Sequence, residues 1–328
     1  MKFLKGIKSL VGLTLFGLPM LAQAQGLGPQ VWPLTPKGML IPNAFYLNLD
    51  TNTTPGGDLI SSESNVNIQL ASTPIFYHFG LGNTLARVMV IPTYTWLKGD
   101  VRLADQKYDI LEKDGFGDLE VLFAVGLVNT PALSMQEFVQ YTPKTQVNLM
   151  VGATAPTGRY DENRLVNIGS NRWSFRVSLP VVVPLSKNKT LPAHFEFVPS
   201  FYMYTDNDDN AFRIKKGQDP KLLIEQHVSK YFTPKFWGSL DFNYEYGARV
   251  KVNDRKIGES LNQFATGATL GYSVVDGMIL SASYGKLWID DEDSDMFRAG
   301  LTLTIPSKKD RQFLEAVKGM QTTTTELE

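Results

Sequence analysis

Apolar and polar residues alternate with a period of two over long stretches of this chain. From Leu240 to Tyr246 every second residue is apolar, and the residues between them, such as Asp241 and Glu245, are polar. The stretches 173–185 and 297–305 repeat this alternation. A strand sorts such residues onto two opposite faces, whereas a helix would scatter them around its axis. The pattern therefore predicts β-strands with one apolar and one polar face.

The same alternation predicts about twelve strands. We place them at 40–51, 62–79, 84–99, 113–129, 143–156, 170–186, 192–206, 218–231, 235–251, 260–274, 277–290 and 294–306. These segments average about fifteen residues, whereas strands of soluble proteins usually have five or six. Their length and even number favour an all-β fold, a transmembrane antiparallel up-and-down β-barrel.

The connections between the expected strands alternate in length. Residues 80–83, 186–189, 232–234 and 275–277 form tight turns, whereas longer polar loops lie at 51–62, 99–113, 156–170, 206–218 and 251–260. Aromatic residues gather near both ends of the segments, as at the two interfaces of a membrane. Short turns typically face the periplasm, where we also expect both termini. A soluble sandwich or lipocalin-like barrel is the alternative, with the apolar face turned inward.

Residues 1–24 have the features of a signal peptide. Three lysines precede an apolar run from Leu10 to Leu21, and the small residues Ala22 and Ala24 frame a cleavage site. The run is about a dozen residues long, whereas a membrane-spanning helix needs about twenty, which argues against the alternative of an anchor. We expect residues 25–306 to form a barrel in the cell outer membrane. Residues 25–40 are a candidate N-terminal plug, and residues 307–328 a polar periplasmic tail.

Composition narrows the possible functions. A formal net charge of −1 gives no reason to expect a nucleic-acid partner, and the absence of cysteine excludes disulfides and thiol catalysis. The sequence contains no GxSxG, phosphate-loop or dinucleotide-binding motif, so we expect neither an enzyme nor a cofactor. A barrel-borne hydrolase is kept as a minor alternative, with Ser174, Ser178 and Ser200 on the polar face.

If the apolar face meets lipid, the polar face lines the lumen. The charged residues and histidines of that face, our candidates for the solute path, are Arg87, Asp118, Glu120, Arg172, Arg176, His194, Glu196, Glu225, His227, Asp241, Glu245, Arg249 and Arg298. Because both signs occur, we expect paired charges rather than a filter of one sign. Two interpretations stay open: the charges maintain the shape of the barrel, or they contact a passing solute.

We expect no metal site. His194 and Glu196 share a strand face, as metal ligands would, but no second cluster of ligands accompanies them. Acidic runs at 206–209 and 290–295 could bind Ca²⁺ through carboxylate oxygens. Neither run has the spacing of an EF-hand loop, so solvated loop tips are the favoured interpretation.

Three short motifs carry a resemblance to a known family. They are GFGD at 115–118, PTGRY at 156–160 and NIGSNRW at 167–173. Together they resemble the outer-membrane protein family called "Putative MetA-pathway of phenol degradation", over most of the mature chain. The proline and glycines also have a local explanation, because they end a strand and permit a turn.

The resemblance implies uptake of small hydrophobic or aromatic solutes. Twelve strands give a narrower lumen than a sixteen-stranded porin, so we expect a constricted path rather than wide-pore diffusion. The alternative from another class is a structural or adhesion barrel that acts through its loops. The expected partners are outer-membrane lipids, lipopolysaccharide, the barrel assembly machinery and the solute.

Overall fold

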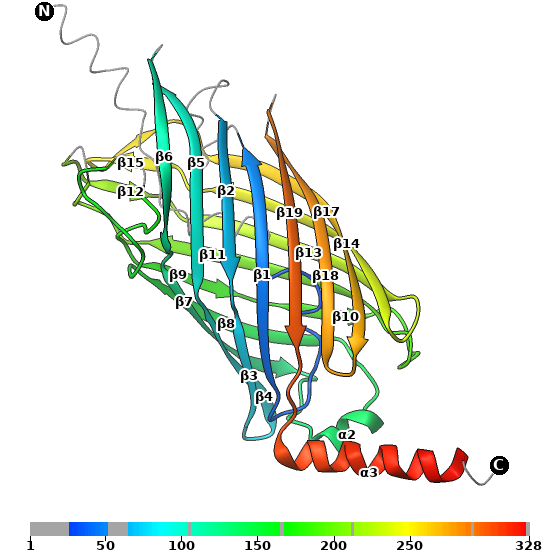
Figure 1. Cartoon of the computed structure of the whole chain (residues 1–328). Coiled ribbons are helices and arrows are strands. Elements are labelled where there is room, and N and C mark those ends of the chain that lie inside the picture. Colours follow the sequence, from blue (N-terminus) through cyan, green and yellow to red (C-terminus); the bar gives the residue numbers. More distant parts are fainter. Residues whose placement is uncertain are drawn as a thin grey trace, which may run out of the picture.

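The computed structural model describes residues 26–51, 65–103, 106–164, 167–210, 213–289 and 292–325. The expected signal peptide, residues 1–24, lies outside the described residues. The chain forms a barrel of slanted strands, with two helices gathered at one end (Figure 1).

The barrel wall is a closed antiparallel sheet. Its strands are β1 (Leu40–Thr51), β2 (Asn65–Ser72), β3 (Ile75–Leu81), β4 (Thr84–Ile91), β5 (Thr93–Leu103), β6 (Gln106–Phe116), β7 (Leu119–Val128), β8 (Gln146–Ala155), β9 (Ser174–Ser178), β10 (Val181–Pro184), β11 (Ala193–Tyr204), β13 (Lys221–Tyr231), β14 (Phe236–Gly247), β17 (Leu261–Val275), β18 (Met278–Ile289) and β19 (Glu292–Leu303). Antiparallel pairing of β1 with β19 closes the ring. The expected antiparallel barrel is confirmed.

Four of the twelve expected segments are broken, although we predicted each as one strand. Pro74 separates β2 from β3, Pro92 separates β4 from β5, and Pro180 separates β9 from β10. Proline cannot donate a hydrogen bond to the sheet, so the pairing stops and the wall bends at these positions. Gly117 and Asp118 separate β6 from β7. The sixteen strands of the wall therefore correspond to twelve segments.

Several connections differ from the prediction. The stretch 99–113 is not a long loop, because β5 and β6 extend into it and leave only residues 104–105 between them. The loops at 206–218 and 251–260 contribute β12 (Lys216–Gln218), β15 (Val250–Val252) and β16 (Arg255–Ile257), a separate three-stranded sheet. Asp219 accepts hydrogen bonds from Lys251 and Lys256 beside this sheet, and these contacts lower the pKa of its carboxyl.

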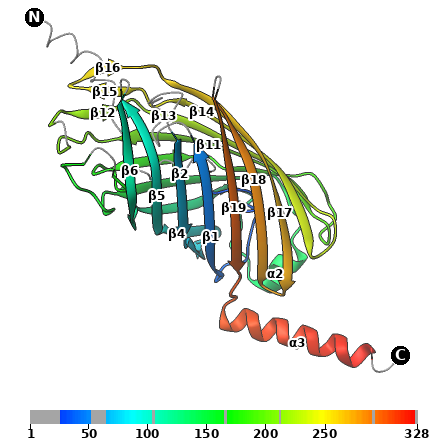
Figure 2. The same ribbon diagram turned by 45° about the horizontal axis from the view of Figure 1, so that its top comes forward.

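Two helices lie at the end of the barrel where the connections are short, which we call the short-turn end; we call the opposite end the loop end (Figure 2). Helix α2 (Met135–Gln140) begins at Ser134, whose side chain forms a capping box with Glu137. Helix α3 (Lys308–Thr325) follows β19 and is the element formed by the expected polar tail. Within the described residues, neither helix has the length and apolar character needed to cross a membrane.

Apolar side chains cover the outside of the wall. Leu240 is 59% exposed and Phe242 is 47% exposed, whereas Ser239 and Glu245 on the alternate positions of β14 are buried. Trp173 and Trp288 are also exposed near the loop end. A soluble barrel would bury these apolar faces, so the exposed fractions fit a wall surrounded by acyl chains.

Candidate functional site

The interior of the barrel is occupied by the N-terminal segment, which we define as residues 26–39. This segment precedes β1, and its Trp32 side chain is only 1% exposed. Trp32 packs in a buried cluster with side chains of the wall, among them Met89, Leu122 and Met150. Val31 and Leu27 of the segment pack against the same cluster. The chain thus fills part of its own lumen before the wall begins.

Glu196 on β11 holds the backbone of the N-terminal segment. Its two carboxylate oxygens accept hydrogen bonds from the amides of Gln30, at 2.8 Å, and Trp32, at 3.1 Å. His194, two residues earlier on the same face, pairs its Nε2 with Oε1 of Gln30 at 3.0 Å. Hydrogen bonds to a carboxylate are stronger than neutral ones, so Glu196 holds the backbone of the segment firmly.

Two glycines let the segment pass close to charged side chains. Gly26 has φ +57°, and a Cβ at this position would lie 1.6 Å from a carboxylate oxygen of Glu225. Gly28 has φ +83°, and its Cβ would lie 2.6 Å from the Arg298 guanidinium. The neighbouring amide of Leu27 donates to Glu225 at 3.0 Å. A side chain at either glycine would push the segment away from the wall.

Arg87 on β4 attaches the segment from another strand of the wall. Its Nη1 donates to the carbonyl of Val31 at 2.8 Å, and its guanidinium lies 5.1 Å from the centre of the Trp32 ring. This combination of hydrogen bond and cation–π contact holds a charged group against an apolar cluster. Arg87, Glu196 and Glu225 therefore approach the segment from three different strands.

Polar contacts among the side chains of the wall connect to this segment through Glu225. Arg176 forms an ion pair with Glu225 at 2.7 Å, and both side chains are almost fully buried. His227 Nδ1 lies 2.7 Å from Asp241, and its Nε2 lies 4.0 Å from Glu225. Asp241 also accepts a hydrogen bond from Thr269. Four of the expected lumen residues thus meet in one network.

Sequence reasoning missed two members of the interior. Lys221 pairs with Glu245 at 2.8 Å, and its ammonium lies 5.0 Å from the ring of Tyr202. The guanidinium of Arg176 lies 5.1 Å from the same ring. Lys221 shares strand parity with Glu225, and Tyr202 shares it with Glu196, so the period-two rule contained the signal for both.

Two of the three serines considered for a hydrolase belong to this network. Ser178 and Ser200 hydrogen-bond each other at 2.7 Å, and Arg176 donates to both. Among the described residues, no group of three or more histidine, aspartate or glutamate side chains is placed to hold a metal ion.

The interior has one apolar and one polar wall, whereas alternation predicted a polar lumen throughout. The apolar interior wall comes from β3, β4, β7, β8, β10 and β11, through Phe76, Met89, Ile91, Leu122, Ala124, Met150, Val182 and Val198. Glu225, Asp241, Glu245 and Arg298 belong to β13, β14 and β19 on the polar side. Trp32 packs against this wall, where the inward positions of the strands carry apolar side chains beside polar ones such as Arg87 and Glu196.

A small cavity remains beside the start of the N-terminal segment. Its volume is about 80 Å³. Apolar side chains, including Phe45, Leu70 and Ile91, line it. The charged residues that also line it are Asp118, Glu120, Arg176 and Arg298. Apolar and ionic groups therefore meet at the wall of this cavity.

The three motifs that carry the family resemblance converge on Asp118. One carboxylate oxygen accepts from the amide of Gly158 at 2.8 Å, and the other accepts from the amide and hydroxyl of Ser170 at 2.8 and 2.5 Å. A Cβ on Gly169 would lie 2.8 Å from the backbone of Gly158, so the two glycines allow close contact. Asp118 joins the break between β6 and β7 to the loop 156–173, rather than standing free in the lumen.

Replacing Asp118 by alanine should release this loop. Losing three hydrogen bonds to a carboxylate costs about 3 kcal/mol or more, so a protease should cut the loop roughly 100-fold faster. Limited proteolysis of the detergent-solubilised barrel, with mass spectrometry of the fragments, measures this rate. Asp208→Ala, at an exposed position on a neighbouring loop, is the control and should leave the rate unchanged. Equal rates for the two variants would contradict the assigned role of Asp118.

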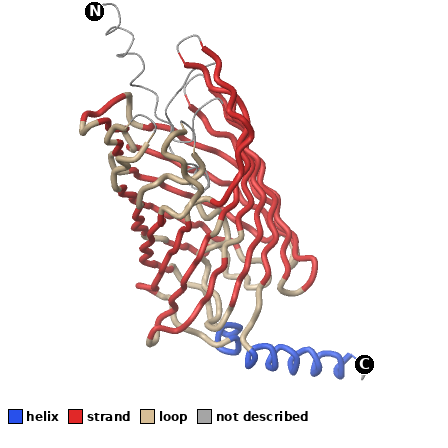
Figure 3. The backbone as a smooth tube through the Cα atoms, turned by 60° about the vertical axis from the view of Figure 1, so that its left-hand side comes forward, coloured by secondary structure: helices blue, strands red, loops and turns tan. Residues whose placement is uncertain are grey.

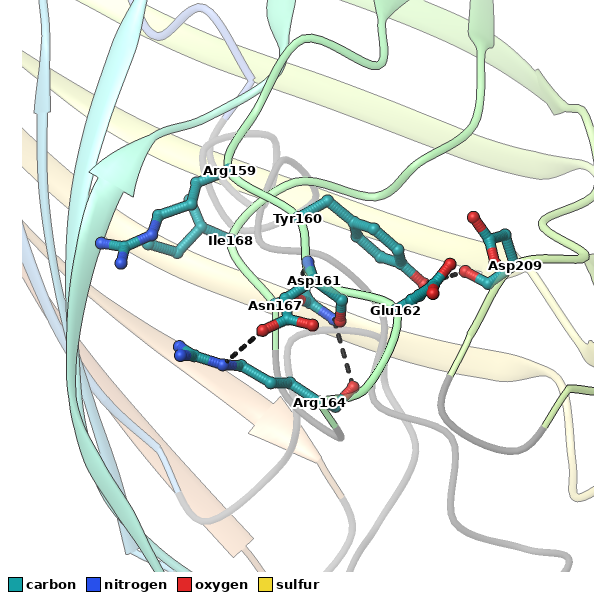
Figure 4. Close-up of a pocket in the computed structure, with 8 residues that line it drawn as sticks. All are labelled: Arg159, Tyr160, Asp161, Glu162, Arg164, Asn167, Ile168 and Asp209. Carbon is teal, nitrogen blue, oxygen red and sulfur yellow. Dashed lines mark hydrogen bonds and ion pairs between the residues drawn. The ribbon is translucent and has the colours of Figure 1, made fainter.

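A second, more open pocket of about 490 Å³ lies above this junction (Figure 4). It is lined by Arg159, Tyr160, Glu162 and Asp209, with four further residues of the same two loops. The Tyr160 hydroxyl donates to the Asp209 carbonyl at 2.6 Å. The adjacent Asp209 side chain raises the pKa of the Glu162 carboxyl through a hydrogen bond and charge repulsion.

The remaining expected residues lie apart from the N-terminal segment. Arg172 hydrogen-bonds Gln218 and lies 4.6 Å from the ring centre of Tyr204. Arg249 is not on the interior face of a wall strand, because β14 ends at Gly247 and β15 begins at Val250. Its placement corrects our prediction, in which the strand continued to residue 251.

Comparison with known proteins places this fold in context. A family model described as "Putative MetA-pathway of phenol degradation" matches residues 23–305. A search of curated protein sequences finds no match. Among solved structures, the COG4313 outer membrane channel from Pseudomonas putida F1 aligns with a TM-score of 0.66 and 16% identity, over 85% of this chain and 100% of that one. This similarity shows a shared fold.

Two further solved structures align less closely. The β domain of the Bordetella autotransporter BrkA has a TM-score of 0.44 and 11% identity, over 82% of this chain and 100% of that one. The CymD monoaromatic hydrocarbon channel has a TM-score of 0.42 and 7% identity, over 83% of this chain and 89% of that one.

Proposed function

Because the chain belongs to the family described as "Putative MetA-pathway of phenol degradation", we propose that it is an outer-membrane channel for small hydrophobic or aromatic solutes. The family description names the degradation of phenol, a small aromatic compound. A cell that degrades such compounds must first bring them across its outer membrane. The barrel fold is suited to this task, since its apolar outer face allows it to span a bilayer.

The apolar interior wall is the observation that carries this proposal. The interior of a diffusion porin is polar and filled with water, whereas here Met89, Leu122 and Met150 form a continuous apolar surface inside the barrel. Covering apolar surface contributes about 25 cal/mol per Å², so an aromatic solute would gain from contact with this wall. A sugar or an inorganic ion would gain nothing there.

Passage requires the N-terminal segment to move. The remaining cavity has a volume of about 80 Å³. A cavity that holds benzene measures about 150 Å³, so the space beside Gly26 is too small for one aromatic ring. Trp32 occupies the apolar wall that the solute would use. The segment therefore acts in this proposal as a plug that a solute must displace.

Uptake of a radiolabelled monoaromatic hydrocarbon by cells of a porin-poor strain tests the proposal. Cells that produce the protein should take up the probe faster than cells with an empty vector. Met150→Gln should reduce this gain because it places a polar group on the apolar wall, where Met150 is fully buried. Asn243→Ser, a replacement by another neutral polar residue on the polar side, is the control.

The folded state of each variant is checked by heat-dependent migration on gels, so loss of uptake can be separated from loss of the barrel. No gain over empty-vector cells from the folded wild-type protein would reject the proposal. Equal uptake by the Met150→Gln variant and the wild type would reject the apolar wall as the path.

A further inference from the structure

Helix α3 lies outside the part of the chain that the family model matches. The family model ends at residue 305, and α3 begins at Lys308. The helix lies at the short-turn end and runs across the direction of β19, and its far end extends past the barrel wall in three views (Figures 1, 2 and 3). The barrel wall is complete without this helix, so its position calls for a separate explanation.

The first turn of α3 is fixed to the barrel by a buried aspartate. Asp310 is 7% exposed, and its carboxylate accepts from the amide of Met135 at 3.2 Å and from the Ser307 hydroxyl at 2.5 Å. The Ser307 hydroxyl in turn accepts from the amide of Asp310 at 3.2 Å. These contacts join α3 to the start of α2, so the direction in which α3 leaves the barrel is set by its cap.

The sequence of α3 is amphipathic with a basic polar face. Phe313, Leu314, Val317 and Met320 fall on one face of the helix by their spacing, and Lys309 and Lys318 flank that face. Phe313 and Leu314 are half-buried, whereas Gln312 and Glu315 on other faces are exposed. The helix carries four basic residues and two acidic ones, and one of these acids, Asp310, is already engaged.

We propose that α3 lies on the membrane surface at the short-turn end, with its apolar face in the acyl-chain boundary and its lysines on anionic phospholipid headgroups. The lipid-facing wall continues to this end of the barrel, where Phe232, Val275 and Ile305 are exposed. A helix that starts beside this belt and runs sideways reaches the headgroup layer next to it. Basic amphipathic helices bind such layers by apolar burial and charge attraction together.

Single-cysteine labelling of the full mature chain tests this position, since the protein contains no cysteine of its own. Leu314→Cys carries an environment-sensitive fluorophore on the apolar face, and Gln312→Cys is the matched control on the polar face. The barrel is reconstituted into vesicles of phosphatidylethanolamine and phosphatidylglycerol that contain brominated acyl chains. The label at 314 should be quenched by the brominated lipid, and the label at 312 by iodide in the water.

Two outcomes would overturn the proposal. Quenching of the 314 label by iodide would show a helix that stands in water, and protection from both quenchers would show a face covered by protein, such as a second copy of the chain. The role of charge is tested by Lys309→Glu with Lys318→Glu. Each basic residue near an anionic surface changes the equilibrium for binding of the helix to the membrane about fivefold, so the quenching by lipid should fall in this variant. Unchanged quenching would show that the lysines do not bind the headgroups.

Discussion

Replacing Glu196 by alanine should raise the probability that the barrel is open by about 100-fold. The substitution removes two hydrogen bonds from backbone amides to one buried carboxylate, those of Gln30 and Trp32. Bonds to charged groups contribute about 1.5 kcal/mol each at the lower end, and about 3 kcal/mol changes an equilibrium by a factor of more than 100. The N-terminal segment should then leave the apolar interior wall far more often.

Single-channel recording in a planar bilayer measures this open probability directly. Glu245→Ala is the matched control, because that carboxylate is equally buried but binds Lys221 and Gln263 instead of the segment. Deleting residues 26–36 should give the upper limit of conductance. If the protein that lacks residues 26–36 has the same conductance as the wild type, the segment does not close the path, and the proposal that it acts as a plug is wrong.

The second large effect is on stability, and we expect it from Arg176→Ala. The Arg176 guanidinium forms an ion pair with Glu225 and donates hydrogen bonds to Ser178 and Ser200. The side chain of Arg176 is 3% exposed and that of Glu225 is 1% exposed. Removing one partner of a buried ion pair typically costs 3–5 kcal/mol because the other charge remains buried and unpaired. The free energy of unfolding should fall by about that amount.

Urea unfolding of the barrel in lipid vesicles, followed by tryptophan fluorescence, measures this change. Arg164→Ala is the control, because its ion pair with Asp161 has side chains that are 47% and 42% exposed and should contribute about 1 kcal/mol or less. The double variant Arg176→Met with Glu225→Gln should recover much of the loss, since no charge is then left alone. Equal destabilisation by Arg176→Ala and Arg164→Ala would contradict the structural role of the network.

The wall of the barrel could be predicted from the sequence because its two faces meet different surroundings. Along a strand such as β14, outward residues like Leu240 are apolar and inward residues like Glu245 are polar. The period of two is therefore visible in the sequence without any knowledge of contacts. The breaks at Pro74, Pro92 and Pro180 were also written in the sequence. The period-two pattern nevertheless predicts one continuous strand at each of these positions, because apolar residues continue on either side of the proline.

The contents of the barrel could not be predicted in the same way. Met89, Leu122 and Met150 take inward positions on strands whose outward residues are also apolar, so the alternation is weak there and does not show which face meets the lumen. The polar contacts of the interior were also hidden, because the partners are distant in sequence. The amide of Trp32 and the carboxylate of Glu196 are 164 residues apart, and the ion pair of Arg176 with Glu225 spans 49 residues. A sequence shows which residues are charged, whereas only the register of the sheet shows which of them meet.

The order of the chain has a consequence for how this barrel can open. The N-terminal segment leads directly into β1, and β1 pairs with the last strand, β19, to close the ring. The segment that fills the interior therefore emerges at the seam. β1 begins at the short-turn end, where Leu40 pairs with Ile305, so the segment enters the lumen through that open end and can leave it again while the seam stays closed.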